Sequence, residues 1–242
     1  MYEERFYREK HKSNDLINYQ LLIEESDLMI SSDIDVKTQA EEALFDIRNR
    51  IKKACSEIEG FKTSLIPINH TSNDPMINQM IKASEKANVG PMAAVAGTVS
   101  EYVVKNVLNN SNCSQIIVEN GGDIYINSNV ARKILIYAGD SPFSNKIGLK
   151  IDKDLMPIGV CTSAGKVGHS LSFGQSDAAL VISKNTSLAD ATATAIGNLV
   201  KEADDINKAL EFGKNIDGIL GILVILEDKL GIWGQIELFK AE

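Results

Sequence analysis

The chain has 242 residues, of which 44% are hydrophobic and 24% are charged, proportions typical of a globular protein with a sizeable core. Its net charge of −8 argues against a general binder of nucleic acid or of membrane surfaces. Residues 1–14 hold no apolar run of the kind that a signal peptide needs, and the most apolar segment, residues 219–226, is too short to cross a bilayer. We therefore expect a cytoplasmic protein that contacts neither nucleic acid nor membrane.

Hydrophobic periodicity predicts a hairpin and three helices in the N-terminal half. Residues 19–23 and 27–30 read as two strands joined by Glu24-Glu25-Ser26. Apolar residues then recur at intervals of three and four, which predicts a helix capped by Asp33 or Asp35. The predicted helices run from this cap to Gly60, from residue 74 to residue 88 with Pro75 in the first turn, and from residue 92 to residue 108.

The remaining chain is mostly strand-like. The predicted strands cover residues 115–118, 124–126, 133–138, 147–151, 158–162, 178–182, 219–226 and 231–239, and the predicted helices cover residues 187–201 and 204–212. Because these elements come in runs and do not alternate strictly, they predict an α+β fold with a largely antiparallel sheet packed with helices. We expect one domain over residues 1–242, with residues 1–15 as a flexible or weakly packed N-terminal segment.

The first candidate site is Asn120-Gly121-Gly122-Asp123, directly after a predicted strand. Two adjacent glycines permit positive φ angles and let backbone N–H groups approach a ligand, so the segment can form a nest for an anion or a carbonyl. The alternative is a plain hairpin turn, because Asn-Gly and Gly-Asp pairs are common in such turns. The local pattern alone favours the turn.

The second candidate site is Thr162-Ser163-Ala164-Gly165, after the strand that ends near Val160. Hydroxyl groups and a glycine at a strand end suit contact with phosphate or ribose, although an ordinary loop has the same composition. His169 follows Gly165 by four residues. Beside a phosphate site this imidazole could donate a proton, accept one or bind phosphate, and otherwise it is a solvated or structurally bonded histidine.

The third candidate site is the predicted helix that starts at Ser187. Asp190 and Thr194 are four residues apart and therefore neighbours on one helix face, where their oxygen atoms suit a hard cation such as Mg²⁺. The alternative is a capping box, with Ser187 as N-cap and Asp190 at the third helical position. Local pattern favours capping, but the order and identity of the three segments together favour metal binding.

A fourth segment, residues 89–97, contains Gly90 and Pro91 before a helix rich in small residues. A helix N-terminus after such a turn can bind an anion. Close packing of this helix against the sheet explains the small residues equally well.

Taken in order, the Asn-Gly-Gly-Asp, Thr-Ser-x-Gly and Ala-Asp-Ala-x-x-Thr-Ala segments resemble the ApbE superfamily, which has a fold related to the T-fold. Members of that family bind flavin and Mg²⁺, and the best-known ones transfer FMN from FAD onto other proteins. The resemblance implies that Asp190 and Thr194 are Mg²⁺ ligands and that His169 is the catalytic histidine. It implies that the following residues border the flavin nucleotide: Asn120, Gly121, Gly122, Asp123, Thr162, Ser163 and Gly165. Gly90 and Pro91 join the cofactor-binding candidates as the start of a helix that can bind an anion.

The chain departs from the flavin transferases at one motif. It reads His169-Ser170-Leu171-Ser172-Phe173, without the His-x-x-Asp-Pro pattern of those enzymes. It looks more like a short cytoplasmic ApbE-like branch of methanogens and sulfate reducers, which shares the Gly-Pro-Met-Ala-Ala-Val-Ala-Gly segment. That resemblance implies a role in anaerobic sulfur assimilation toward homocysteine with an iron–sulfur partner protein.

Three functions follow as alternatives. The first is a protein that binds FAD, FMN or another phosphorylated nucleotide with Mg²⁺, with flavin transfer as its activity if it is an enzyme. The second is a non-catalytic accessory or binding subunit of a redox or sulfur-transfer complex. The third is a metal-dependent hydrolase of nucleotide pyrophosphates. By analogy with the fold family, we also expect association of copies into a homo-oligomer.

Overall fold

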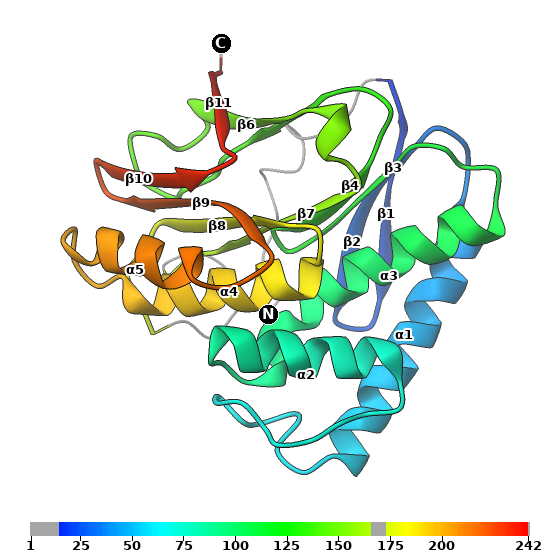
Figure 1. The fold of residues 1–242 in the computed structure, drawn as a ribbon. Helices are drawn as coiled ribbons and strands as arrows, with labels where there is room; N and C mark the ends of the chain where they lie inside the picture. Colours follow the sequence, from blue (N-terminus) through cyan, green and yellow to red (C-terminus); the bar gives the residue numbers. More distant parts are fainter. Residues whose placement is uncertain (1–14, 166–172, 242) are drawn as a thin grey trace.

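A computed structural model describes residues 15–165 and 173–241 (Figure 1). The predicted flexible segment of residues 1–15 lies outside the described residues except for Asp15, and His169 lies outside them as well. Two antiparallel sheets and a layer of helices make up the described fold. This architecture confirms the predicted α+β class with a largely antiparallel sheet.

The larger sheet forms the middle layer. Within the described ranges it has eight strands, in the order β1 (Ile17–Ile23), β2 (Ser26–Ser32), β3 (Ile116–Asn120), β4 (Asp123–Asn127), β7 (Ile158–Ser163), β8 (Ala178–Ser183), β9 (Ile219–Leu226) and β10 (Lys229–Gly234). A smaller sheet has the order β11 (Glu237–Lys240), β6 (Ile147–Ile151) and β5 (Arg132–Leu135).

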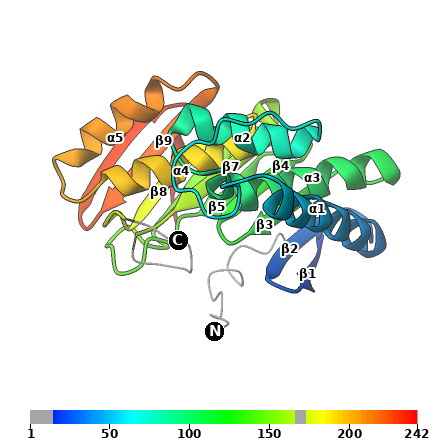
Figure 2. The same cartoon turned by 90° about the horizontal axis from the view of Figure 1, so that it is seen from below.

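Helices cover one face of the larger sheet. Their bounds are α1 (Lys37–Glu57), α2 (Pro75–Ala87), α3 (Val95–Asn110), α4 (Thr186–Leu199) and α5 (Asp205–Lys214), with short 3-10 helices η2 (Pro91–Ala94) and η3 (Lys153–Leu155). Helices α3, α4 and α5 follow one another across the sheet, and α2 packs outside them against α4 (Figures 1 and 2). None of the helices in the described residues is long and apolar enough to span a membrane.

The alternation of side chains along each strand separates two hydrophobic cores. Strand residues such as Val118, Tyr125 and Val181 face the helices. Their neighbours Ile126 and Leu180 face the smaller sheet. Both faces of the central strands are therefore buried, which is why β8 and β9 read as nearly continuous apolar runs.

Some predicted boundaries are correct and others are wrong. The N-cap of α1 is Val36 and neither Asp33 nor Asp35, although the Asp35 carboxylate accepts the Lys37 N–H at 3.0 Å. Asp74 caps α2 as predicted, because its carboxylate accepts the N–H groups of Met76 and Ile77. The predicted helix of residues 92–108 instead begins as η2, and the α-helix starts at Val95. The predicted strand 231–239 is two strands in different sheets, since Gly234 has a φ of +79° and the chain turns there from one sheet to the other.

We predict that Gly97→Ala destabilises the protein by about 1–3 kcal/mol through overpacking. A Cβ atom at this position would lie 2.6 Å from the Thr186 carbonyl oxygen and 2.9 Å from the Asp190 Cβ, so α3 and α4 would have to separate. The measurement is urea unfolding. Gly197→Ala is the matched control, because its nearest contact would be 3.4 Å; it should change stability by no more than about 1 kcal/mol. Equal effects of both variants would contradict the prediction.

Candidate functional site

The Asn120–Asp123 segment is a two-residue hairpin turn between β3 and β4. Gly121 and Gly122 have φ angles of +66° and +102°, and Asn120 pairs with Asp123 across the hairpin. Positive φ at both central positions is the requirement of a type I′ turn, which explains the two glycines. The turn also lies against the second motif, since a Cβ on Gly122 would be 3.4 Å from the Thr162 carbonyl oxygen.

Asp123 leaves this turn toward the helices and meets the third motif. Its side chain is 7% exposed, and that of Asp190 on α4 is 8% exposed. The Asp123 Oδ1 atom has no hydrogen-bond partner among the described residues, and the negative charge of Asp190 acts on the Asp123 carboxyl. The fold therefore brings a carboxylate from the first motif next to one from the third.

The N-terminus of α3 supplies the hydrogen bonds that hold Asp190. The Gly97 N–H donates to Asp190 Oδ2 at 2.8 Å, and the Ala96 N–H also donates to this carboxylate. The anion site predicted at the start of this helix is thus occupied by a carboxylate of the chain itself. Gly90 lies against the Ser64 backbone, because a Cβ there would overlap the Ser64 carbonyl oxygen at 1.8 Å. Close packing explains Gly90, with Pro91 buried beside it.

The predicted capping box at Ser187 is wrong. The N-cap of α4 is Asn185, whose side chain accepts the Leu188 N–H at 2.9 Å. The Ser187 hydroxyl instead meets Gln79 and Thr98 from neighbouring helices. Asp190 points to α3 and does not reach back to its own helix start. Capping therefore does not account for Asp190. The local explanation that stood against metal binding by this residue is removed.

The second motif runs from the sheet toward the far end of α4. A Cβ on Gly197 would lie 3.4 Å from Ser163 Oγ, and a Cβ on Gly165 would lie 2.4 Å from the Gly174 carbonyl oxygen. The Gly165 N–H donates to the Ser176 carbonyl oxygen at 2.8 Å. Gly165 and Gly174, which are on either side of His169 in the sequence, thus lie close together beside α4. Thr194 lies between these contacts and Asp190 along the helix and is half-buried.

Burial dominates the electrostatics of the carboxylate pair. It raises the pKa of Asp190 to about 7, against the opposing effect of the N–H groups of Gly97 and Ala96. Burial, and next the charge of Asp190, raise the pKa of Asp123 well above its usual range. Burial, then the same two carboxylates, raise the pKa of the Cys161 thiol well above its ordinary value. A thiol in this setting is a poor nucleophile.

The donor set fits a hard divalent cation. Two buried carboxylates, one with an unpartnered oxygen, together with the Thr194 hydroxyl are the oxygen ligands that Mg²⁺ prefers. No group of three or more His, Cys, Asp or Glu residues suited to a metal occurs among the described residues. A cation here would therefore complete its coordination with water, backbone or phosphate oxygens, as Mg²⁺ commonly does.

Sequence reasoning missed two residues behind the site, Glu101 and Gln79. Glu101 is 2% exposed and accepts the N–H of Thr186, the first residue of α4. In the sequence, Glu101 and Lys105 look like an ordinary i,i+4 pair on a solvated helix face. Only the position of α4, which is far away in the chain, shows that this glutamate is buried.

We predict that the carboxylate pair makes the cation-free protein less stable as pH rises. A carboxyl whose pKa is higher in the folded than in the unfolded state binds more protons when folded, so the stability that its proton provides is lost between about pH 4 and about pH 7. The measurement is the free energy of unfolding at about pH 5 and about pH 8 with a chelator. Asp190→Asn should gain stability relative to the wild type at the higher pH. Parallel pH profiles of the two proteins would refute this.

Comparison with known proteins identifies the family of this chain. The chain matches the family model described as AbpE bacteria over residues 8–238. It is 41% identical to a UPF0280 protein of Methanococcus aeolicus, with 91% of each chain covered. It is 38% identical to a UPF0280 protein of Methanocaldococcus jannaschii, with 92% of this chain and 93% of the relative covered.

Solved structures share the fold at low identity. The flavinyl transferase ApbE of Pseudomonas stutzeri has a TM-score of 0.56 and 14% identity, with 90% of this chain and 93% of that chain covered. The ApbE protein of Thermotoga maritima has a TM-score of 0.56 and 12% identity, with 94% and 97% covered. The chain therefore belongs to the AbpE bacteria family, with the UPF0280 proteins of methanogens as relatives, and has the fold of the ApbE flavin transferases.

Proposed function

We propose that this protein binds a flavin nucleotide, FAD or FMN, through Mg²⁺ held by Asp190, Thr194 and Asp123. The observation that carries the proposal is the pair of buried carboxylates at the meeting point of the three motifs. Two neighbouring buried carboxylates repel each other and are poorly solvated, and a divalent cation relieves both costs. When bound, Mg²⁺ would neutralise the charge of a nucleotide pyrophosphate.

The remaining motif residues would shape the nucleotide site. The Gly121-Gly122 turn leaves the backbone without a Cβ beside Thr162, so a ligand could approach the main chain there. Ser163 and Gly165 continue this surface along α4. His169 would act, in flavin transfer, as the group that moves a proton or steadies the transferred phosphoryl group. This assignment rests on its place in the sequence.

The relatives support the nucleotide as ligand class. The solved structures of this fold include a flavinyl transferase, and the flavin transferase of Vibrio cholerae has a TM-score of 0.55 to this chain. We extend this to flavin transferase-type chemistry in the cytoplasm. A part in anaerobic sulfur assimilation, an iron–sulfur partner protein and a homo-oligomer stay predictions from the resemblance.

We predict that the wild type binds FAD in an Mg²⁺-dependent way and that Asp190→Asn weakens this binding at least about tenfold, because a metal ligand is lost. The measurement is calorimetric titration of FAD with Mg²⁺ and with a chelator. Asp228→Asn is the control, since this carboxylate lies in an exposed turn and pairs only with Lys229 at 3.3 Å among the described contacts.

Product analysis separates the three functions. Release of AMP together with FMN attached to an acceptor protein indicates transfer, whereas AMP with free FMN indicates pyrophosphate hydrolysis. Binding without AMP release favours an accessory subunit. Equal FAD affinity with and without Mg²⁺, or an unchanged affinity in Asp190→Asn, would contradict the proposed metal site.

A further inference from the structure

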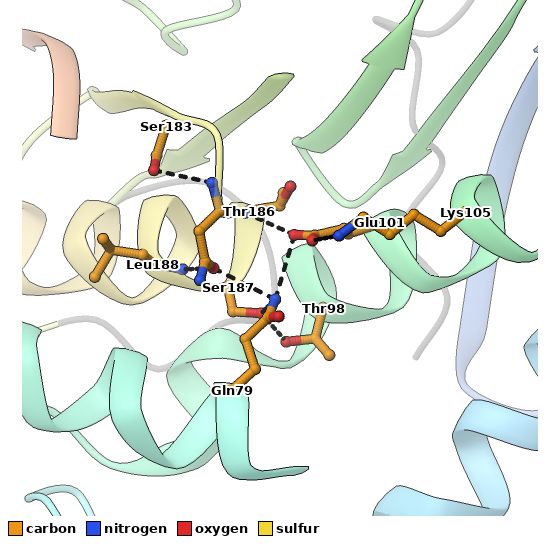
Figure 3. A network of polar contacts seen from close by, with 9 residues as sticks. Gln79, Thr98, Glu101, Lys105, Ser183, Thr186, Ser187 and Leu188 are labelled. Carbon is orange, nitrogen blue, oxygen red and sulfur yellow. Dashed lines mark hydrogen bonds and ion pairs between the residues drawn. The ribbon is translucent and has the colours of Figure 1, made fainter. Parts of the chain in front are cut away.

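A buried polar network from three helices holds the first turn of α4 (Figure 3). Glu101 on α3 accepts the Thr186 N–H at 2.8 Å. Helix starts leave such N–H groups without a partner inside their own helix. The local N-cap, Asn185, serves the Leu188 N–H, so the carboxylate that satisfies Thr186 comes from another helix.

Gln79 on α2 connects the same elements. Its Nε2 lies 2.8 Å from Ser187 Oγ, 3.3 Å from Glu101 Oε2 and 3.4 Å from Asn185 Oδ1. The Ser187 hydroxyl in turn lies 2.6 Å from Thr98 Oγ1 on α3. The start of α4 is therefore fixed from both α2 and α3.

The charge of Glu101 is compensated although its side chain is almost fully buried. Lys105, one turn further along α3, pairs with Glu101 Oε1. The N-terminus of α4 also carries partial positive charge, which favours a carboxylate. The Glu101 carboxylate therefore lies between the Lys105 ammonium group and the first turn of α4, where it accepts the Thr186 N–H.

The contacts between α3 and α4 are reciprocal. Glu101 on α3 accepts an N–H from the first residue of α4, and Asp190 on α4 accepts an N–H from Gly97 in the first turn of α3. Gly97 and Glu101 are four residues apart, as are Thr186 and Asp190, so each pair spans one helical turn. Two such bonds, one turn apart, fix both the rotation and the axial position of α4 against α3.

We propose that Glu101 is a positioning residue, which sets the place of the Asp190 carboxylate relative to Asp123 for cation binding. The inference rests on the proposed function, because the position of Asp190 matters only if a cation is bound there. Without Glu101, the Thr186 N–H loses its partner, and the first turn of α4 keeps only its bonds through Ser187 to Thr98 and Gln79 and through Asp190 to the start of α3. The position of Asp190 is then less tightly fixed.

The test compares Glu101→Ala with Glu101→Gln. The amide oxygen of glutamine can still accept the Thr186 N–H, so Glu101→Gln should rescue part of the effect. Two readouts are used: Mn²⁺ binding by electron paramagnetic resonance, and Mg²⁺ titrated in the presence of FAD. We expect Glu101→Ala to weaken both affinities at least about tenfold, which is the usual loss when a side chain that holds a metal ligand in place is removed.

A stability control separates positioning from simple destabilisation. Ile151→Val changes the buried core next to the smaller sheet, on the far side of the larger sheet from the helices. It should lower the melting temperature while leaving the Mn²⁺ affinity within about twofold, whereas Glu101→Ala should lower both. If Glu101→Ala does not fold, Glu101→Gln carries the test with a smaller loss of affinity.

The outcomes are distinct from those for the proposed function. Wild-type cation binding that Asp190→Asn abolishes, but that both Glu101 variants retain at full affinity, overturns the positioning role and leaves the metal site intact. Absence of cation binding by the folded wild type overturns both. A loss in Glu101→Ala that is partly restored in Glu101→Gln supports both.

Discussion

The crossing of α3 and α4 is the contact on which the described site depends. The two helices approach so closely at Gly97 that a single Cβ atom would meet the Thr186 carbonyl oxygen. At this distance the carboxylate of Asp190 reaches the free N–H groups at the start of α3. Helix N-termini attract negative charge. The same close approach that requires a glycine therefore also gives a buried acid its hydrogen bonds.

The second constraint comes from the sheet. The Asn120–Asp123 turn needs positive φ at two successive positions, and the glycines that satisfy it send β4 back with Asp123 facing the helices. The Ser100 hydroxyl on α3 donates to the Asp123 carbonyl oxygen at 2.9 Å. The backbone of Asp123 is thus fixed while its Oδ1 stays unpartnered among the described residues. A buried acid held in this way is costly without a cation, which is typical of functional sites.

Local patterns predicted what depends on local geometry. The sequence predicts the helix start at Asp74, the hairpin glycines and the alternation of side chains along the strands. Each of these features depends only on residues that are close together in the sequence. The capping box at Ser187 is wrong because the local pattern cannot show that Asn185 is the N-cap of α4. Nor can it show that the Ser187 hydroxyl bonds with Gln79 and Thr98. Glu101 gave no signal, since its burial depends on a helix that follows it by 85 residues.

The buried carboxylates and the segment that contains His169 belong to different parts of the chain. The carboxylates belong to the hairpin and to the crossing helices, which are buried and bonded on several sides. His169 follows Gly165 by four residues, in a stretch of sequence that lacks the His-x-x-Asp-Pro pattern. The crossing of α3 and α4 tolerates little change, because one added methyl group at Gly97 would meet the Thr186 backbone. Under the proposed function, substitutions around His169 can therefore change the chemistry while the carboxylate pair at the helix crossing is kept, because a shared fold does not require a shared reaction.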